Sequence, residues 1–268
     1  MNRYWSSEEE TFLREYYNGE NAKEIALKLN RTVSSIWHKA SRLGISKSPI
    51  NIPNLSPSPS LLFILGTILS DGSVHKTKRS NKNGRGAECR IQLIVKNYEY
   101  AQAFLNALKK IGLTNSKIYG PYGPYSCQLG SSERYVVSSY SKVFYDWFKR
   151  LEIEDIKKII SSNPELAEFF AAGYFYGDGY VYEKEFGKKM ISIITTEKEN
   201  ADLLMYALSL IGFHPKFNGP YGPYSQNPKS FDKKPLYFVR LNRFNESEKF
   251  IKIAQQCLKE MRKYNERG

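Results

Sequence analysis

The sequence is poor in the residues that bind zinc or form disulfide frameworks. It contains three cysteines and three histidines among 268 residues. No two of the cysteines, Cys89, Cys127 and Cys257, form a C-x-x-C pair, and the histidines are equally scattered. This scarcity argues against a zinc site, a disulfide framework and a nuclease site built on histidine. We expect the cysteines to be reduced thiols in a cytoplasmic protein.

Long apolar runs are also missing. No run approaches the ~20 residues that a helix needs to cross a bilayer. The first ten residues, MNRYWSSEEE, are polar and acidic, unlike a secretory signal. We therefore expect a soluble protein without a membrane partner.

Acidic residues are in deficit. Lys and Arg number 40 against 27 Asp and Glu, which gives a formal net charge of +13 and a pI of about 9.4. Residues 61–150 alone hold 14 Lys and Arg against 5 Asp and Glu, or +9. Such a balance indicates a polyanionic partner, by default a nucleic acid. The 20 tyrosines suit this partner, because a hydroxyl can contact phosphate while the ring contacts a base or sugar.

Two stretches repeat one pattern. They are ILGTILSDG at residues 64–72 and AAGYFYGDG at residues 171–179, and they align at a constant offset of 107 residues. Each predicts an apolar helix that carries small residues on one stripe, which would let two helix backbones approach closely. The stripe residues, which we assign to a helix interface, are Gly66, Ser70, Gly173 and Gly177.

Each of these helices is expected to end at an aspartate. The following glycine can adopt the left-handed conformation that terminates a helix. If the two helices pack together, Asp71 and Asp178 meet at two helix C-termini, and the negative potential there favours a divalent cation. Asp-Gly between apolar residues is also a hairpin-turn signal. Two occurrences, each after an apolar run with a helix-start signal, favour the helices.

A second repeat extends the first. GPYGPYS occurs at residues 120–126 and again at residues 219–225, and the helix expected before it is repeated as well. Each unit is expected to run helix, strand, strand, helix, strand, strand, helix. The sequence therefore predicts an α+β fold in which an αββαββα unit is duplicated, with residues 152–162 as the bridge.

The turn after the first motif is long and basic. We assign its cations and the start of the next strand to contact with a DNA backbone; the alternative is a solvated loop. The residues are Lys76, Lys78, Arg79, Lys82, Arg85 and Arg90.

Residues 1–45 predict a separate three-helix domain. Ser6 and Glu9 form a capping box for the first helix, Asn21 and Glu24 open a second, and Thr32 opens a third. Residues 46–60, SKSPINIPNLSPSPS, are rich in proline and serine and are expected to be a semi-stiff linker.

This N-terminal domain resembles Myb/SANT-like and resolvase-type helix-turn-helix modules. The resemblance rests on W-x-x-E-E, K-E-I-A-x-K-L, N-R-T and R-L-G-I in order. It implies that the third helix enters the major groove of DNA; a protein-interaction bundle is the alternative. The implied DNA contacts are Arg31, Ser34, Ser35, His38, Lys39 and Arg42.

Residues 61–261 resemble the LAGLIDADG homing endonucleases in their single-chain, two-motif form. The resemblance implies units at residues 61–151 and 152–268, a pseudo-twofold DNA-binding saddle, and a monomer. It further implies that Asp71 and Asp178 bind Mg²⁺, with Mn²⁺ as a substitute, and activate water for phosphodiester hydrolysis.

The sequence departs from the family pattern in two places. The sixth motif letter, usually Asp, is Leu69 in one unit and Tyr176 in the other. The polar residues that the family carries at the end of the second strand, often Gln and Lys, align with Asn97 in one unit and with Glu197 and Lys198 in the other. These further catalytic candidates are Asn97, Glu197, Lys198 and Lys96, with Lys142 and Arg243 as additional cations.

Three functions compete. The leading interpretation is a sequence-specific, double-strand DNA endonuclease encoded by an intron or a free-standing mobile element. The alternatives on the same scaffold are a catalytically silent DNA-binding regulator and a maturase that binds intron RNA. Two aspartates facing a polyanion favour the nuclease, because a pure binder has no use for them.

Overall fold

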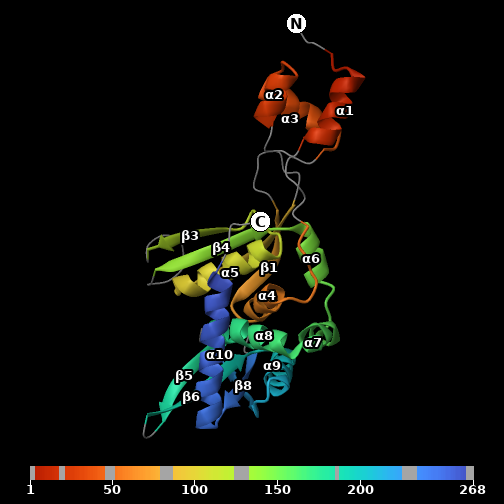
Figure 1. Cartoon of the computed structure of the whole chain (residues 1–268). Helices are drawn as coiled ribbons and strands as arrows, with labels where there is room; N and C mark the ends of the chain where they lie inside the picture. Colours follow the sequence, from red (N-terminus) through yellow and green to blue (C-terminus); the bar gives the residue numbers. More distant parts are fainter. Residues whose placement is uncertain are drawn as a thin grey trace. The chain divides into compact units, whose positions relative to one another are not determined.

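A computed structural model describes residues 4–17, 22–45, 52–78, 87–123, 133–184, 187–224 and 234–263. The chain divides into two compact units, Met1–Asn51 and Ile52–Gly268, which we call the N-terminal unit and the core unit (Figure 1). Among the described residues, no helix is both long and apolar enough to span a membrane.

The N-terminal unit holds three short helices, α1 (Ser7–Tyr16), α2 (Ala22–Lys28) and α3 (Val33–Arg42). The capping box that opens α1 is complete, since Ser6 Oγ accepts from Glu9 N–H and Glu9 accepts from Ser6 N–H. Thr32 caps α3 by accepting from Ser35 N–H. The helices enclose a small apolar core of their own, which includes Leu13, Ile25 and Ile36. Asn21, the expected cap of α2, lies outside the described residues.

The core unit repeats one order of elements. Its first half contains α4 (Pro59–Leu69), β1 (Gly72–Lys78), β2 (Ala87–Val95), α5 (Tyr98–Lys110), β3 (Lys117–Tyr122), β4 (Arg134–Tyr140) and α6 (Lys142–Phe148). After α7 (Ile153–Ser161), the second half contains α8 (Pro164–Asp178), β5 (Gly179–Lys184), β6 (Lys188–Thr195), α9 (Lys198–Leu210), β7 (Lys216–Tyr224), β8 (Lys234–Leu241) and α10 (Phe244–Arg262). The predicted duplication is thus confirmed.

Each half forms one antiparallel sheet, in the strand orders β1-β2-β4-β3 and β5-β6-β8-β7. The registers correspond residue for residue. The first residue of β1, Gly72, pairs with Leu93, which pairs with Val137. The matching row of the second sheet is Gly179, Ile193 and Val239. The predicted α+β class with two four-stranded sheets is therefore confirmed, and Val137 and Val239 are equivalent positions.

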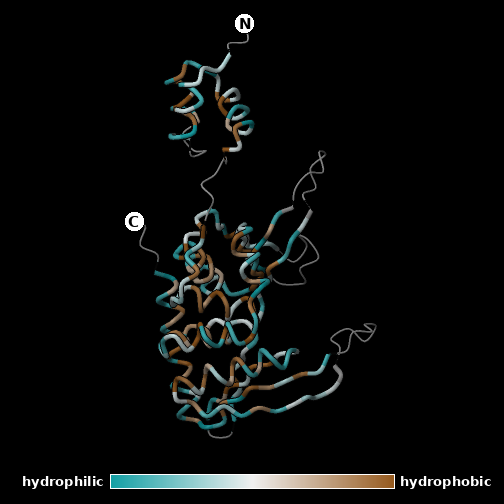
Figure 2. The backbone as a smooth tube through the Cα atoms, turned by 90° about the vertical axis from the view of Figure 1, so that its right-hand side faces the viewer, coloured by the Kyte–Doolittle hydropathy of each residue, from teal (hydrophilic) through white to brown (hydrophobic). Residues whose placement is uncertain are grey.

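The core lies between the helices and one face of each sheet. Along β2, buried Ile91, Leu93 and Val95 alternate with half-buried residues, so one face of the sheet is covered and the other stays open. Helix α4 is apolar all round and buried from Ser60 to Ile68. Hydrophobic segments, brown in Figure 2, gather in the middle of this unit.

The two halves are tied together by more than their motif helices. Helix α10 runs past α5 of the first half (Figure 1), where Asn106 Nδ2 donates to Arg262 O at 2.8 Å. Arg262 also forms an ion pair with Glu99 at 2.7 Å. The segment expected as a linker up to Ser60 joins the core unit earlier, since Asn54 N–H donates to Ile111 O at 2.7 Å and Ser58 caps α4.

Candidate metal centre and nucleic-acid interface

Helices α4 and α8 touch backbone to backbone at their glycines. A Cβ atom on Gly66 would lie 2.1 Å from the carbonyl oxygen of Phe170, and one on Gly173 would lie 2.4 Å from that of Phe63. Phe63 and Phe170 are related by the same offset of 107 residues as the two glycines. The contact is therefore symmetric about a pseudo-twofold axis, and no side chain larger than hydrogen fits at either glycine.

The two helices also meet at their C-terminal ends. A Cβ atom on Gly177 would lie 2.2 Å from Ser70 Oγ and 3.1 Å from Asp71 N. Asp178 follows Gly177 directly, so the two motif aspartates lie beside each other where α4 and α8 end. The symmetric packing upstream determines this juxtaposition.

The glycines after the aspartates do not adopt the expected left-handed conformation. Gly72 and Gly179 open β1 and β5, and Gly179 is extended, with φ −90° and ψ 148°. Glycine is required at these two positions for a steric reason and not for its backbone conformation. A Cβ on Gly179 would lie 2.2 Å from Phe175 Cδ2, and one on Gly72 would lie 2.8 Å from Ile68 Cα. At both glycines the backbone turns so sharply from helix to strand that the start of the strand packs against the last turn of the helix.

The electrostatics of this place favour a cation. Loss of solvent, together with the neighbouring Asp71 carboxylate, raises the pKa of Asp178 to about 7. Loss of solvent also raises the pKa of Asp71, and Arg134 opposes that rise. Two carboxylates that repel each other, neither of them ion-paired within the described part of the chain, suit a divalent cation.

A metal at this place would have few protein ligands. Among the described residues, no three His, Cys, Asp or Glu side chains gather into a cluster. A divalent cation between the two aspartates would complete its oxygen shell with water, backbone carbonyls or phosphate oxygens. Mg²⁺ commonly binds proteins through one or two carboxylates and substrate phosphates, so the residues present fit such an ion.

Two further residues bind backbone carbonyl groups of the motif helices. Tyr100 Oη, on α5, donates to Gly173 O at 2.9 Å, and Asn200 Nδ2, on α9, donates to Leu69 O at 3.2 Å. Each bond joins one half of the core unit to the other. Burial raises the pKa of Tyr100, so its hydroxyl remains a donor. Sequence reasoning did not assign either residue, although they occupy equivalent positions in the repeated helices α5 and α9.

The polar candidates at the ends of the second strands are engaged locally. Asn97 caps α5 by accepting from Tyr100 N–H at 3.0 Å. Glu197 forms an ion pair with Lys234 at 2.8 Å, and Lys198 lies 3.4 Å from Asp202. Lys96 is exposed at the end of β2. The additional cations are also paired, Lys142 with Asp146 and Arg243 with Glu246.

The basic residues of the first sheet are only partly described. Lys76 is exposed on β1, and the guanidinium of Arg90 lies 5.1 Å from the ring centre of Tyr140. Lys78 is described in its backbone alone, as the last residue of β1. Arg79, Lys82 and Arg85 lie outside the described residues.

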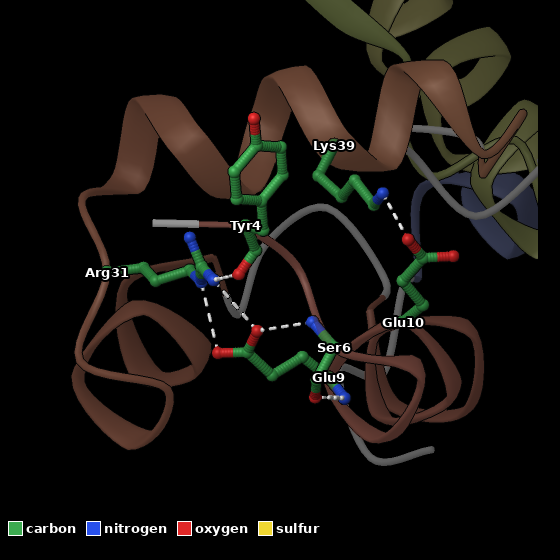
Figure 3. Close-up of polar contacts among 6 residues, drawn as sticks. All are labelled: Tyr4, Ser6, Glu9, Glu10, Arg31 and Lys39. Atoms are coloured by element: carbon green, nitrogen blue, oxygen red, sulfur yellow. Dashed lines mark hydrogen bonds and ion pairs between the residues drawn. The ribbon is translucent and has the colours of Figure 1, made fainter. Parts of the chain in front are cut away.

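In the N-terminal unit, Arg31 is not on an exposed face, which corrects the expectation from the sequence. Its Nη2 and Nε bind the two carboxylate oxygens of Glu9 at 2.8 and 3.1 Å (Figure 3). Its guanidinium lies 4.1 Å from the ring centre of Trp5. Only 6% of the Arg31 side chain is exposed. Arg31 is buried because it binds Glu9. The carboxylate of Glu9 accepts from Ser6 N–H in the capping box and can still accept hydrogen bonds from the guanidinium.

The other candidates on α3 differ in exposure. Lys39 is paired with Glu10, and its side chain is 16% exposed. Ser35 is half-buried near the capped start of the helix. The exposed candidates lie along one side of α3, at positions Ser34, His38 and Arg42.

Comparisons with known proteins agree with this architecture. Residues 165–231 match the LAGLIDADG-like domain family. The chain is 28% identical over 162 residues to Uncharacterized protein MJ0314 of Methanocaldococcus jannaschii, covering 59% of this chain and 57% of that protein. It is 25% identical over 185 residues to Uncharacterized protein MJ0398 of the same organism, covering 69% and 59%. The chain thus spans less than two thirds of the length of these curated relatives.

Among solved structures, the fold is similar to that of mesophilic variants of the homing endonuclease I-DmoI. The TM-score is 0.50 at 18% sequence identity, over 74% of this chain and 96% of that chain. I-DmoI has also been solved in complex with DNA and Mn, with a TM-score of 0.49 at 18% identity over 73% and 96% of the two chains. The resemblance to the two-motif LAGLIDADG fold is thereby confirmed at the level of the fold.

Proposed function

We propose that this chain, which shares its fold with the homing endonuclease I-DmoI, is a sequence-specific endonuclease that cuts both strands of DNA with a divalent metal. The observation that carries the proposal is the juxtaposition of Asp71 and Asp178 at the paired ends of α4 and α8. A protein that only binds DNA gains nothing from two carboxylates that repel the phosphates.

In this proposal the two aspartates hold Mg²⁺, or Mn²⁺ in its place. Such an ion, when bound, lowers the pKa of an attacking water and offsets charge on the leaving oxygen. Asp178 must lose its proton before it can bind the ion, because its pKa is raised to about 7. The backbone contact at Gly66 and Gly173 fixes the separation of the two carboxylates. One carboxylate then serves each DNA strand.

The open faces of the two sheets are the proposed surface for double-stranded DNA. The net charge of +13 supplies the attraction to phosphate. On the described strands, half-buried Arg90 belongs to this surface, whereas exposed Lys76 shares the helix-covered face of buried Val74. The N-terminal unit is proposed to add contacts through Ser34, His38 and Arg42 of α3, in the manner of a helix-turn-helix module.

The pseudo-twofold axis lets one chain present two half-sites, so we propose that the protein acts as a monomer. As a homing endonuclease, it would be encoded by an intron or by a free-standing mobile element. A silent regulator and a maturase acting on intron RNA remain the competing functions, and each predicts binding without cleavage of DNA.

Cleavage selection tests this function without knowledge of the target. The full chain is incubated in Mg²⁺, and separately in Mn²⁺, with a plasmid library that carries randomised inserts, and the cut ends are sequenced. We expect one family of related inserts to be cut in both strands, and chelation of the metal to abolish cutting. A doubly substituted Asp71→Asn, Asp178→Asn chain is the control. A chain that binds DNA but cuts no insert in either metal would overturn the nuclease proposal.

A further inference from the structure

The two halves of the core unit differ at one position beside the aspartates. Val137 and Val239 are equivalent by the sheet registers. Three residues earlier, β4 carries Arg134 and β8 carries Leu236. Each of these residues pairs with the tyrosine of the Gly-Pro-Tyr sequence in its neighbouring strand, which makes the equivalence independent of the valines.

The register brings Arg134 to the same end of its sheet as Asp71. Strands β1 and β4 are both antiparallel to β2, so they run in the same direction. Residues before Val137 therefore lie at the end where β1 begins, directly after Asp71. Because Val137 is fully buried against the helices, alternation along the strand puts Arg134 on the opposite, open face.

The guanidinium of Arg134 keeps an unused donor. Its Nε is buried and has no hydrogen-bond partner among the described residues. Arg134 is near enough to Asp71 to lower the pKa of that carboxyl, yet the two form no ion pair within 4.0 Å. A half-buried guanidinium with a free donor on a face open to DNA suits a phosphate oxygen, which arginine can bind with two parallel hydrogen bonds.

The second half has no equivalent group at this place. Leu236 is half-buried and cannot donate a hydrogen bond. The cation two residues earlier, Lys234, is engaged by Glu197 at 2.8 Å. The environments of Asp71 and Asp178 therefore differ in charge, although the helices that carry them are symmetric.

We infer that Arg134 binds the phosphate of one DNA strand beside Asp71, that Leu236 cannot do so beside Asp178, and that the two strands are consequently cut at unequal rates. This inference rests on the proposed nuclease function. It names a substrate-binding residue that the motif pattern does not contain.

The test follows each strand separately. A duplex obtained by the cleavage selection is labelled with a different fluorophore on each strand, and the full chain in excess cuts it in Mg²⁺. Arg134→Leu should slow one strand roughly tenfold to a hundredfold, as expected for the loss of charge-assisted hydrogen bonds to phosphate, and change the other only a few-fold. Arg134→Lys should fall between. Leu236→Arg should bring the two rates closer together.

A matched control separates this effect from loss of charge alone. Arg150→Leu removes the same charge from the exposed turn after α6 and should leave the ratio of the two strand rates unchanged. Binding of the duplex without metal gives a readout independent of cleavage. In this binding measurement, the slope of log affinity against log salt should be shallower by about 1 in Arg134→Leu than in the unsubstituted chain.

Several outcomes would overturn the inference. Equal slowing of both strands by Arg134→Leu, or an unchanged rate on both, contradicts it while the nuclease function stands. If the cleavage selection returns no cut insert, the proposed function fails. The salt slope is then measured on a mixed-sequence duplex that the chain binds, and an unchanged slope in Arg134→Leu excludes the phosphate contact as well. Should Arg134→Leu not fold, Arg134→Lys and Leu236→Arg carry the same test.

Discussion

A Cβ atom on Gly66 would lie 2.1 Å from the carbonyl oxygen of Phe170, which is closer than any real pair of such atoms. The second neighbour of that Cβ, at 2.8 Å, is another backbone atom, Tyr174 N. A rotating side chain cannot relieve this clash, because backbone would have to move. The interface between α4 and α8, and with it the position of Asp71 beside Asp178, depends on the absence of a side chain at Gly66 and at its counterpart Gly173.

We therefore predict that Gly66→Ala destabilises the core unit by more than about 2 kcal/mol, as overpacking of a dense interface does. Alanine is the better helix former by about 1 kcal/mol, so a net loss means that the clash outweighs this gain. Gly123→Ala is the control, because a Cβ there would meet nothing within 4 Å. Urea unfolding measures both; equal midpoints would show that α4 and α8 do not pack as described.

The buried pair of Arg31 and Glu9 gives a second prediction. Arg31→Met removes the charge and keeps much of the aliphatic chain, and should destabilise the N-terminal unit by about 3–5 kcal/mol because Glu9 is left without its partner. Lys142→Ala breaks a pair whose lysine is 78% exposed and should leave stability almost unchanged, because solvent screens such a pair. Amide hydrogen exchange in the full chain measures both effects. Exchange in α2 and α3 reports on Arg31→Met, and exchange in α6 reports on Lys142→Ala. Unchanged protection in Arg31→Met would contradict the structural role of this pair.

The raised pKa of Asp178 predicts how stability depends on pH. The folded state holds this proton more tightly than the unfolded chain does, so its contribution is fully present in acid, below the ordinary carboxyl pKa. The contribution is lost as the pH rises toward about 7. In metal-free buffer, Asp178→Asn should therefore stabilise the protein at pH 8, by about 2 kcal/mol after allowing for solvent screening.

Added Mg²⁺ should raise the melting temperature of the unsubstituted chain at pH 8 and have little effect on Asp178→Asn, since binding to the folded state alone stabilises it. Asp202→Asn, which removes an exposed carboxylate on α9, serves as the control and should respond to Mg²⁺ like the unsubstituted chain. An Asp178→Asn variant that is less stable than the unsubstituted chain at pH 8 without metal would contradict the raised pKa of Asp178.

The N-terminal unit should add affinity without chemistry. A chain that begins at Ile52 keeps the bond from Asn54 to Ile111 and the complete core, and should fold. It should bind DNA more weakly, with a shallower salt dependence because fewer phosphates are neutralised, and cut the same phosphodiesters when in excess. The full-length Arg42→Ala variant, which lacks one exposed cation of α3, should lose part of the same affinity for DNA. Unchanged affinity in the shortened chain would make this unit a protein-interaction domain.

Much of the fold could be predicted from the sequence because its determinants are local and occur twice. The apolar run before Asp71, the capping box of Ser6 and Glu9, and the repeated Gly-Pro-Tyr sequence each indicate an element within a few residues. Repetition then shows that the elements belong to two copies of one unit. Even the small-residue stripe of Gly66 and Ser70 indicates a close helix contact before any partner is known.

The remaining features depend on partners that are distant in the sequence. Nothing near Arg31 shows that Glu9, 22 residues away, takes its guanidinium. The bond from Tyr100 to Gly173 and the approach of Arg134 to Asp71 likewise exist only once strands and helices are packed. Gly179 illustrates a different error, because its small size was explained by backbone conformation when the actual cause is contact with Phe175.

Cleavage by the single aspartate variants tests the proposed role of Asp71 and Asp178 most directly. Asp71→Asn and Asp178→Asn are each incubated in Mg²⁺ with a supercoiled plasmid that carries the selected target, and binding to the same target is measured without metal. We predict that each variant binds within a few-fold of the unsubstituted chain, or more tightly because a negative charge near phosphate is gone, and that neither forms linear product. Linear product formed by either variant at the rate of the unsubstituted chain would contradict this role.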